Sequence, residues 1–117
     1  PGGAPGAAEG PGAAGEAPLT DEEQEFLAEM AERQRQLAEA PGALVVAQNA
    51  FLLVELAAVK MGAEPPSLDD ARLAIDALGA MVEAVGSRLG EVEPELRRWV
   101  TDLRVRYVEA AKAATAP

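Results

Sequence analysis

The sequence predicts an all-α protein: an antiparallel up-down-up bundle of three core helices, preceded by an acidic capping helix and a disordered tail. The first observation is composition, because Ala, Leu, Glu and Arg abound while aromatic residues make up only 3% of the 117 residues. The second is that apolar residues recur at alternating spacings of three and four over long segments. The third is that Pro and Gly fall between those segments, where helices are expected to end.

Residues 1–18 form the expected tail. They consist of Pro, Gly and Ala with two Glu. A segment of this composition buries too little apolar surface to offset the entropy that it loses on ordering. We therefore expect residues 1–18 to be disordered.

Residues 19–41 are expected to form an acidic amphipathic helix. Thr20 and Glu23 belong to a T-x-x-E capping box, which marks a helix start, and Pro41 marks the end. Much of the formal net charge of −10 lies here, because residues 1–40 carry nine acids and only two arginines. The apolar stripe of this helix is too thin to predict firm docking; it consists of Phe26, Leu27, Met30 and Leu37.

Residues 42–117 are expected to form the bundle domain, and its first helix, Ala43–Met61, is apolar on almost every face. A helix of this kind must be covered on more than one side. One of its stripes has no polar member and consists of Leu44, Ala47, Phe51, Val54, Ala58 and Met61. A second stripe is interrupted only by an amide and consists of Val45, Asn49, Leu52, Leu56 and Val59.

The next two predicted helices have continuous apolar seams. Ser67 is expected to cap the first of them, Gly90 to end it, and Pro94 to occupy the first helical position of the second. The first seam consists of Ala71, Ile75, Leu78, Val82, Val85 and Leu89. The second seam consists of Leu96, Val100, Leu103, Tyr107 and Ala110.

One antiparallel register matches these seams. Turning the last two helices back on each other pairs Val82 with Val100, and the neighbouring seam residues then pair in order. The same operation places the stripe that contains Asn49 against the middle helix, so the stripe that contains Phe51 has no partner inside the bundle. Charges beside the seams predict two interhelical ion pairs, Glu83 with Arg97 and Asp76 with Arg104.

The unpartnered stripe predicts a homo-oligomer, a dimer or higher, joined through residues 43–61. Burying four of its larger side chains contributes on the order of 6 to 12 kcal/mol before ordering costs. Either the helix of residues 19–41 or a second copy of the chain covers it, and we favour the second copy because that helix is thin in apolar residues. Asn49 either fixes the register as a buried amide or points outward beside Gln48. The predicted partner interface is Leu44, Ala47, Phe51, Val54, Ala58 and Met61.

Three motifs carry a resemblance to a known family. They are AFLLVELAAVKMG from Ala50, ARLAIDALGAMVEAVGSRLG from Ala71 and, most specific of all, DLRVRYVEA from Asp102. On these motifs, residues 44–113 resemble a small bacterial family catalogued as domain of unknown function 1844. The resemblance implies a small helical domain, and it implies no activity, cofactor or substrate because the family has no assigned biochemical role.

The residue types exclude most enzyme chemistry. The chain has no His and no Cys, so Ser-His and Cys-His nucleophilic pairs, thiolates and the common zinc sites are absent. The clustered carboxylates fall at predicted helix starts, where acids are favoured in any case, and they lack the spacing of a calcium loop. We expect no catalytic residue, no cofactor and no metal site.

The sequence favours a cytoplasmic protein without a membrane span. The absence of Cys fits a reducing compartment, and no signal peptide is visible. A span over residues 43–59 is disfavoured because Asn49 and Glu55 would lie inside it and no cluster of basic residues flanks it.

The alternative to self-association is a small RNA- or ribosome-associated protein. A basic face with nearby aromatic residues can contact RNA, and the last helix provides Arg97, Arg98, Arg104 and Arg106. The net charge of −10 opposes contact with a phosphate backbone. The preferred hypothesis is therefore a non-enzymatic self-association or protein-interaction module.

Overall fold

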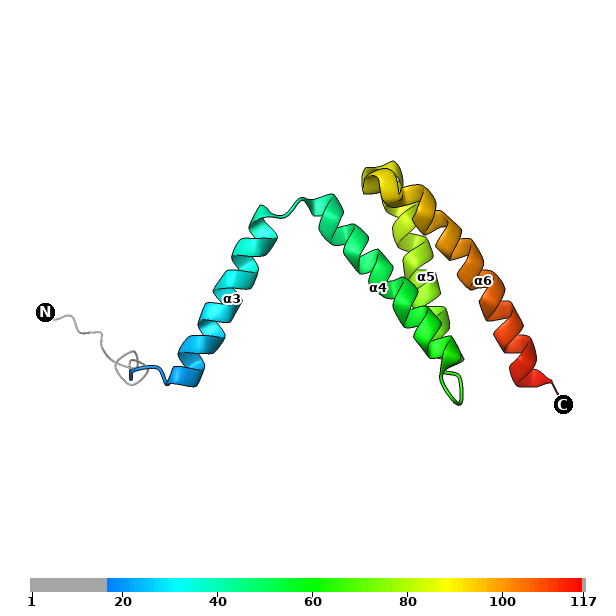
Figure 1. Ribbon diagram of the computed structural model, residues 1–117, viewed down its shortest axis with the longest axis horizontal. Helices are drawn as coiled ribbons and strands as arrows, with labels where there is room; N and C mark the ends of the chain where they lie inside the picture. The colour runs from blue at the N-terminus through cyan, green and yellow to red at the C-terminus, as the bar shows by residue number, and fades with distance from the viewer. Residues whose placement is uncertain (1–16, 117) are drawn as a thin grey trace, which may run out of the picture. The chain divides into compact units, whose positions relative to one another are not determined.

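The computed structural model describes residues 17–116, and every regular element in that range is a helix (Figure 1). The all-α prediction is thereby confirmed. Apart from its last two residues, the tail predicted over residues 1–18 lies outside the described range. The elements are α3 (Asp21–Glu39), α4 (Gly42–Gly62), α5 (Leu68–Val85), the 3-10 helix η1 (Gly86–Val92) and α6 (Glu93–Thr115).

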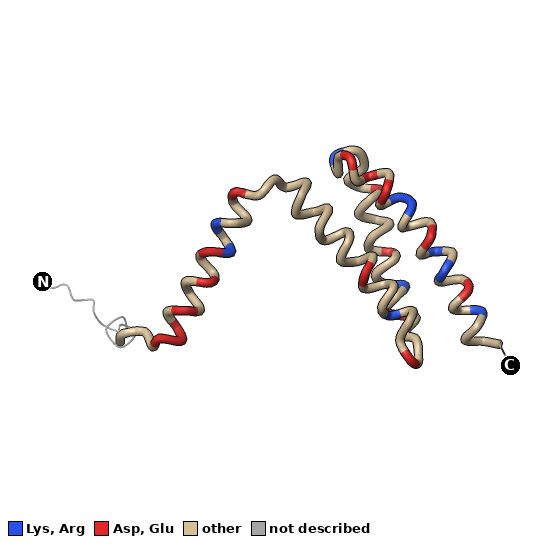
Figure 2. The backbone as a smooth tube through the Cα atoms, in the orientation of Figure 1, with Lys and Arg blue, Asp and Glu red and all other residues tan. Residues whose placement is uncertain are grey.

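The chain divides into two compact units, and α3 is the helix of the first unit, residues 1–39. The predicted capping box starts it: the Thr20 N–H donates to Glu23 Oε1 at 2.9 Å, and the Glu23 N–H donates to Thr20 Oγ1 at 3.0 Å. Arg35 pairs with Glu32 and Glu39 on the same helix. The hydrogen bond to Glu32 has the larger effect and that to Glu39 the smaller, and both raise the pKa of Arg35. Figure 2 shows acids along the whole length of α3, none of whose residues is buried.

The second unit, residues 40–117, contains the hydrophobic core. Helix α4 contacts α5 and α6, and α5 contacts α6, while η1 touches all three. Every buried residue in the described part of the chain is apolar. The largest fully buried side chains are Leu78, Leu96 and Leu103.

Helices α5 and α6 bury the seams that their sequences predict. Ala71, Ile75, Leu78 and Val82 are buried on α5, and Leu96, Val100 and Leu103 are buried on α6. Val82 and Val100 line one surface hollow together, as their predicted pairing requires.

Gly79 faces α6 at this contact. A Cβ built on Gly79 would lie 2.6 Å from Arg104 Nη2 and 3.8 Å from Val100 Cγ1. A side chain at position 79 would therefore displace the arginine, and glycine lets the two helices lie close together.

Helix α5 ends earlier than the sequence predicts. Gly86 has φ of 59° and its N–H donates to the Val82 carbonyl, so the α-helix stops at Val85 instead of near Gly90. Gly90 has φ of 78° and provides a second bend within η1. Two glycines that both accept positive φ allow the chain to reverse direction within a short 3-10 segment.

Replacing Leu78 with Ala tests the core of the second unit. Leu78 is fully buried, so Leu78→Ala is expected to lower the free energy of unfolding by about 2 to 5 kcal/mol, as measured by urea unfolding. Leu73, on the same helix, is 69% exposed and is the matched control, with an expected change within about 0.5 kcal/mol for Leu73→Ala. Equal effects of the two substitutions would contradict the assigned inner face of α5.

Candidate interaction surface

Helix α4 buries a different face from the one that the sequence suggested. Ala47 and Val54, from the stripe predicted to lack a partner, are buried in the core, and Phe51 and Met61 pack against it. Leu44 is half exposed, while Phe51, Ala58 and Met61 are partly buried, so Leu44 is the member of that stripe most open to water. The expectation that the chain itself leaves this stripe uncovered is therefore wrong.

Small side chains explain which face of α4 turns inward. Ala50 and Ala57 are fully buried and, with Ala47, let the backbone of α4 approach its neighbours closely. The alternative face would have placed the Asn49 amide against Val82, and an unpaired buried amide costs about 1 to 3 kcal/mol. Close packing through alanine and the cost of burying the amide favour the same orientation.

The face that α4 turns to water is the second stripe, and we name it the α4 outer face: Val45, Asn49, Leu52, Leu56 and Val59. Leu52 is 57% exposed, Leu56 39% and Val59 67%. Asn49 is exposed as well, and its Nδ2 donates to the Val45 carbonyl at 2.8 Å. Figure 2 shows how few charges α4 carries along its length. The α4 outer face is therefore an apolar surface exposed to solvent in this unit.

Sequence reasoning assigned these exposed residues to the core. A helix that is apolar nearly all round gives no contrast by which hydrophobic periodicity could choose a face. The alanines at positions 47, 50 and 57 were the available signal, since they mark the side that allows the closest approach.

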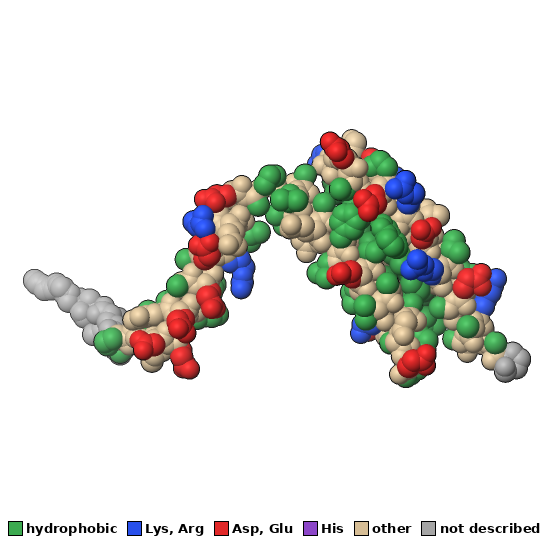
Figure 3. Space-filling view, in the orientation of Figure 1, with side chains coloured by type: hydrophobic (Ala, Val, Ile, Leu, Met, Phe, Trp, Pro, Cys, Tyr) green, Lys and Arg blue, Asp and Glu red, His purple; other side chains and the backbone are tan. Residues whose placement is uncertain are grey.

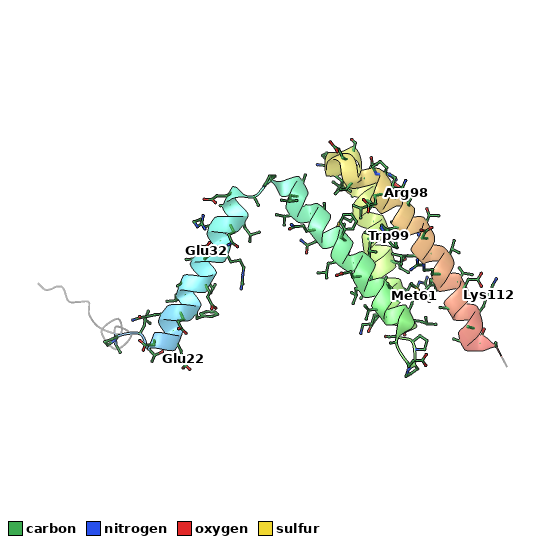
Figure 4. The ribbon with its side chains drawn as sticks, in the orientation of Figure 1. Glu22, Glu32, Met61, Arg98, Trp99 and Lys112 are labelled. Carbon is green, nitrogen blue, oxygen red and sulfur yellow. The ribbon has the colours of Figure 1, made fainter. Side chains whose placement is uncertain are left out.

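A hollow of about 620 Å³ lies beside the α4 outer face, between α4 and α6. Phe51, Leu52 and Trp99 contribute its apolar wall, and Figure 3 shows hydrophobic side chains gathered over this region. Trp99 projects from α6 toward α4 (Figure 4). The Arg106 guanidinium lies over the Trp99 ring, 5.7 Å from its centroid. Exposed carboxylates also line the hollow, from Glu55 and Glu95. The lining of the hollow therefore combines apolar side chains with two carboxylates and one guanidinium.

The four arginines proposed for RNA binding do not share one surface. Arg97 and Arg104 line one hollow together with Glu83, Arg106 lies over Trp99, and Arg98 lies beside Glu95 and Asp102. Arg97 Nε donates to Glu93 Oε2 at 2.6 Å. Glu93, more than Glu83, raises the pKa of Arg97. The structure therefore divides the four arginines between two places, Arg97 with Arg104 in one hollow and Arg98 and Arg106 around Trp99.

The predicted interhelical ion pairs do not form within residues 17–116. Arg97 pairs with Glu93 on its own helix, and Asp76 pairs with Arg72 at 3.7 Å, also on its own helix. Two side chains four residues apart on one helix are already close, so pairing them costs less side-chain entropy than pairing side chains on different helices. The ion pairs within each helix are therefore favoured.

An ion pair instead links the end of α4 to the start of α5. Lys60 Nζ lies 3.2 Å from Asp70 Oδ2, and the Ser67 hydroxyl donates to the same oxygen at 3.0 Å. Ser67 thus bonds a carboxylate, and the expected side-chain cap to a backbone N–H is not formed. The hydrogen bond from Lys60, followed by that from Ser67, lowers the pKa of Asp70.

Two further features bear on binding. Among residues 17–116, no group of three acidic side chains has a geometry that could hold a metal ion.

Within the same range α4 alone is long and apolar enough to cross a membrane, and 22% of its most apolar 18-residue stretch is buried. The core helix of a bundle meets the same criterion of length and composition, so this observation does not separate the two possibilities.

Comparison with known proteins finds no family model, curated protein or solved structure that matches the chain. The resemblance of residues 44–113 to domain of unknown function 1844 therefore stays a prediction. The candidate site has to be argued from its own geometry.

The Asp70 contact predicts a pH effect of defined sign. Because its pKa is lowered in the folded state, the ionised carboxylate stabilises the fold above its unfolded pKa, and this contribution is lost as pH falls through the folded pKa. Lys60→Met is expected to return the pKa toward its ordinary value, and Ser67→Ala to do so by less, in an NMR titration of the Asp70 carboxyl. Lys112→Met, which removes a lysine of α6, is the control and should leave this titration unchanged.

Proposed function

We propose that this chain is a non-enzymatic α-helical self-association module in which a second copy covers the α4 outer face. The single observation that carries the proposal is that Leu52, Leu56 and Val59 are exposed in line on a helix whose opposite side is packed into a core. Contiguous exposed apolar side chains of this kind mark interaction surfaces.

The proposal includes an up-down-up bundle formed by α4, α5 and α6. All three helices contact one another, and the α4–α5 and α5–α6 connections are short, which favours antiparallel neighbours. The shared hollow of Val82 and Val100 supports the same register between α5 and α6.

The expected association is weak. In a pair of chains, burying the exposed parts of Leu52, Leu56 and Val59 on each copy would contribute about 5 to 10 kcal/mol. The cost of lost translational and rotational freedom is of similar size, about 4 to 15 kcal/mol. The balance favours a reversible assembly that depends on concentration and on additional contacts such as those at the Phe51 and Trp99 hollow.

The RNA-binding alternative is disfavoured, although Arg106 and Arg98 lie beside Trp99. Its arginines are distributed over separate surfaces, and acids interleave with them on α6. The formal net charge of −10 adds a repulsive term against any phosphate backbone.

Replacing Leu52 and Leu56 together with Ser tests the proposed interface. The wild-type chain is expected to sediment as a concentration-dependent dimer, and L52S/L56S as a monomer with unchanged helicity, because the lost side chains are exposed in the single chain. Analytical ultracentrifugation and circular dichroism measure the two properties.

Leu73→Ser is the control, since it removes a leucine of α5 that is more exposed than Leu52 or Leu56 and should leave the dimer intact. A wild-type chain that stays monomeric up to its solubility limit would sink the proposal. So would a monomer that partitions into phosphatidylcholine vesicles, because lipid would then be what covers α4.

A further inference from the structure

The α4 outer face has the spacing of a coiled-coil seam. Its residues follow one another at intervals of four, three, four and three, which places Asn49 and Leu56 at a positions, and Val45, Leu52 and Val59 at d positions. The structure leaves four of these residues exposed and Val45 partly buried, whereas most of the seam residues of α5 and α6 are buried in the core. In a coiled coil, a single Asn at an a position specifies the register and the number of helices that associate.

We infer that α4 pairs with α4 of a second copy in parallel and in register, so that Asn49 faces Asn49 of the partner subunit. This inference rests on the self-association proposed above and adds the orientation and the register of the pair. Two observations carry it, the position of the amide and the arrangement of charge beside the seam.

The amide favours the parallel orientation. In a parallel pair each a position faces the same a position, so one Asn49 carbonyl accepts a hydrogen bond from Nδ2 of the partner's Asn49. Nδ2 already donates one hydrogen to the Val45 carbonyl, and its second hydrogen is the one available to the partner. In an antiparallel pair a positions face d positions, and Asn49 would lie against an apolar side chain with its carbonyl unsatisfied.

The charges beside the seam favour the same orientation. Glu55 occupies a g position and Lys60 the following e position, and these are the two positions that meet across a parallel seam. Each chain therefore provides one half of two equivalent ion pairs. In an antiparallel pair g positions face g positions and e positions face e positions, so Glu55 cannot meet the partner's Lys60.

Lys60 is placed to make this contact. Its side chain is partly exposed, and its ammonium group lies at the edge of α4 beside Asp70. An ammonium group has three hydrogens, so it can bond Asp70 and a carboxylate of the partner together. The pair of chains would thus extend the link that already joins α4 to α5.

Disulfide trapping tests the orientation, and the absence of cysteine from the chain makes it specific. In a parallel, in-register pair, Val45→Cys and Leu56→Cys each form a homodisulfide rapidly under mild oxidation, while a mixture of the two variants gives little 45–56 product. An antiparallel pair that places Asn49 against the partner's Leu52 also places position 45 against position 56, so it gives the mixed product and little of either homodisulfide. Ala80→Cys, exposed on α5, is the control and is expected to crosslink at least tenfold more slowly.

Asn49→Leu tests the role of the amide. Introduced into both cysteine variants, it is expected to tighten association about tenfold and to let the mixed 45–56 disulfide appear alongside the homodisulfides, since an apolar a position no longer opposes the antiparallel pair. An unchanged crosslinking pattern would overturn the assignment of register to Asn49.

Failure of this inference is distinguishable from failure of the proposed function. A wild-type dimer in sedimentation that gives only the mixed disulfide, or no disulfide at either position, overturns the parallel pairing and leaves self-association standing. A monomer in sedimentation overturns both.

Discussion

The close approach of α4 to its neighbours is the constraint on which the rest of the second unit depends. Ala50, Ala57 and Ala71 are all fully buried, so the backbones can come near enough for Leu78, Leu96 and Leu103 to fill the space between them. Because alanines occupy the inner face of α4, its larger aliphatic side chains are directed to the flanks and to water. The way the core is packed thus determines which surface the protein presents.

Local signals in the sequence were sufficient for most helix boundaries and for two of the three packed faces. The Thr20 capping box and the Pro94 start act within a single turn, and the seams of α5 and α6 stand out against polar neighbours. The inner face of α4 was not predictable in this way, because leucine and alanine count alike as apolar although they differ in how near they let a second helix come. For this reason the exposed apolar surface is the α4 outer face, although the sequence suggested the stripe that contains Phe51.

The charged residues show a related limit. A register that matches apolar seams brings Glu83 near Arg97 and Asp76 near Arg104, yet Arg97 and Asp76 each pair with an oppositely charged residue one turn away on their own helix. Sequence patterns give the neighbourhood of a charge, while the choice among neighbours depends on side-chain entropy and exposure. Ser67 is a further example, because its hydroxyl donates to the Asp70 carboxylate, three residues on, and does not cap a backbone N–H at the start of α5.

The core of the described residues contains no buried polar or charged group. Apolar cores tolerate exchanges that conserve volume, so the interior can drift in sequence while the helices keep their places. In the proposed self-association, specificity for the partner lies in the α4 outer face, whose residues the core does not require. Such a division allows a lineage to change what the protein associates with, or to lose association altogether, without first having to find a new fold.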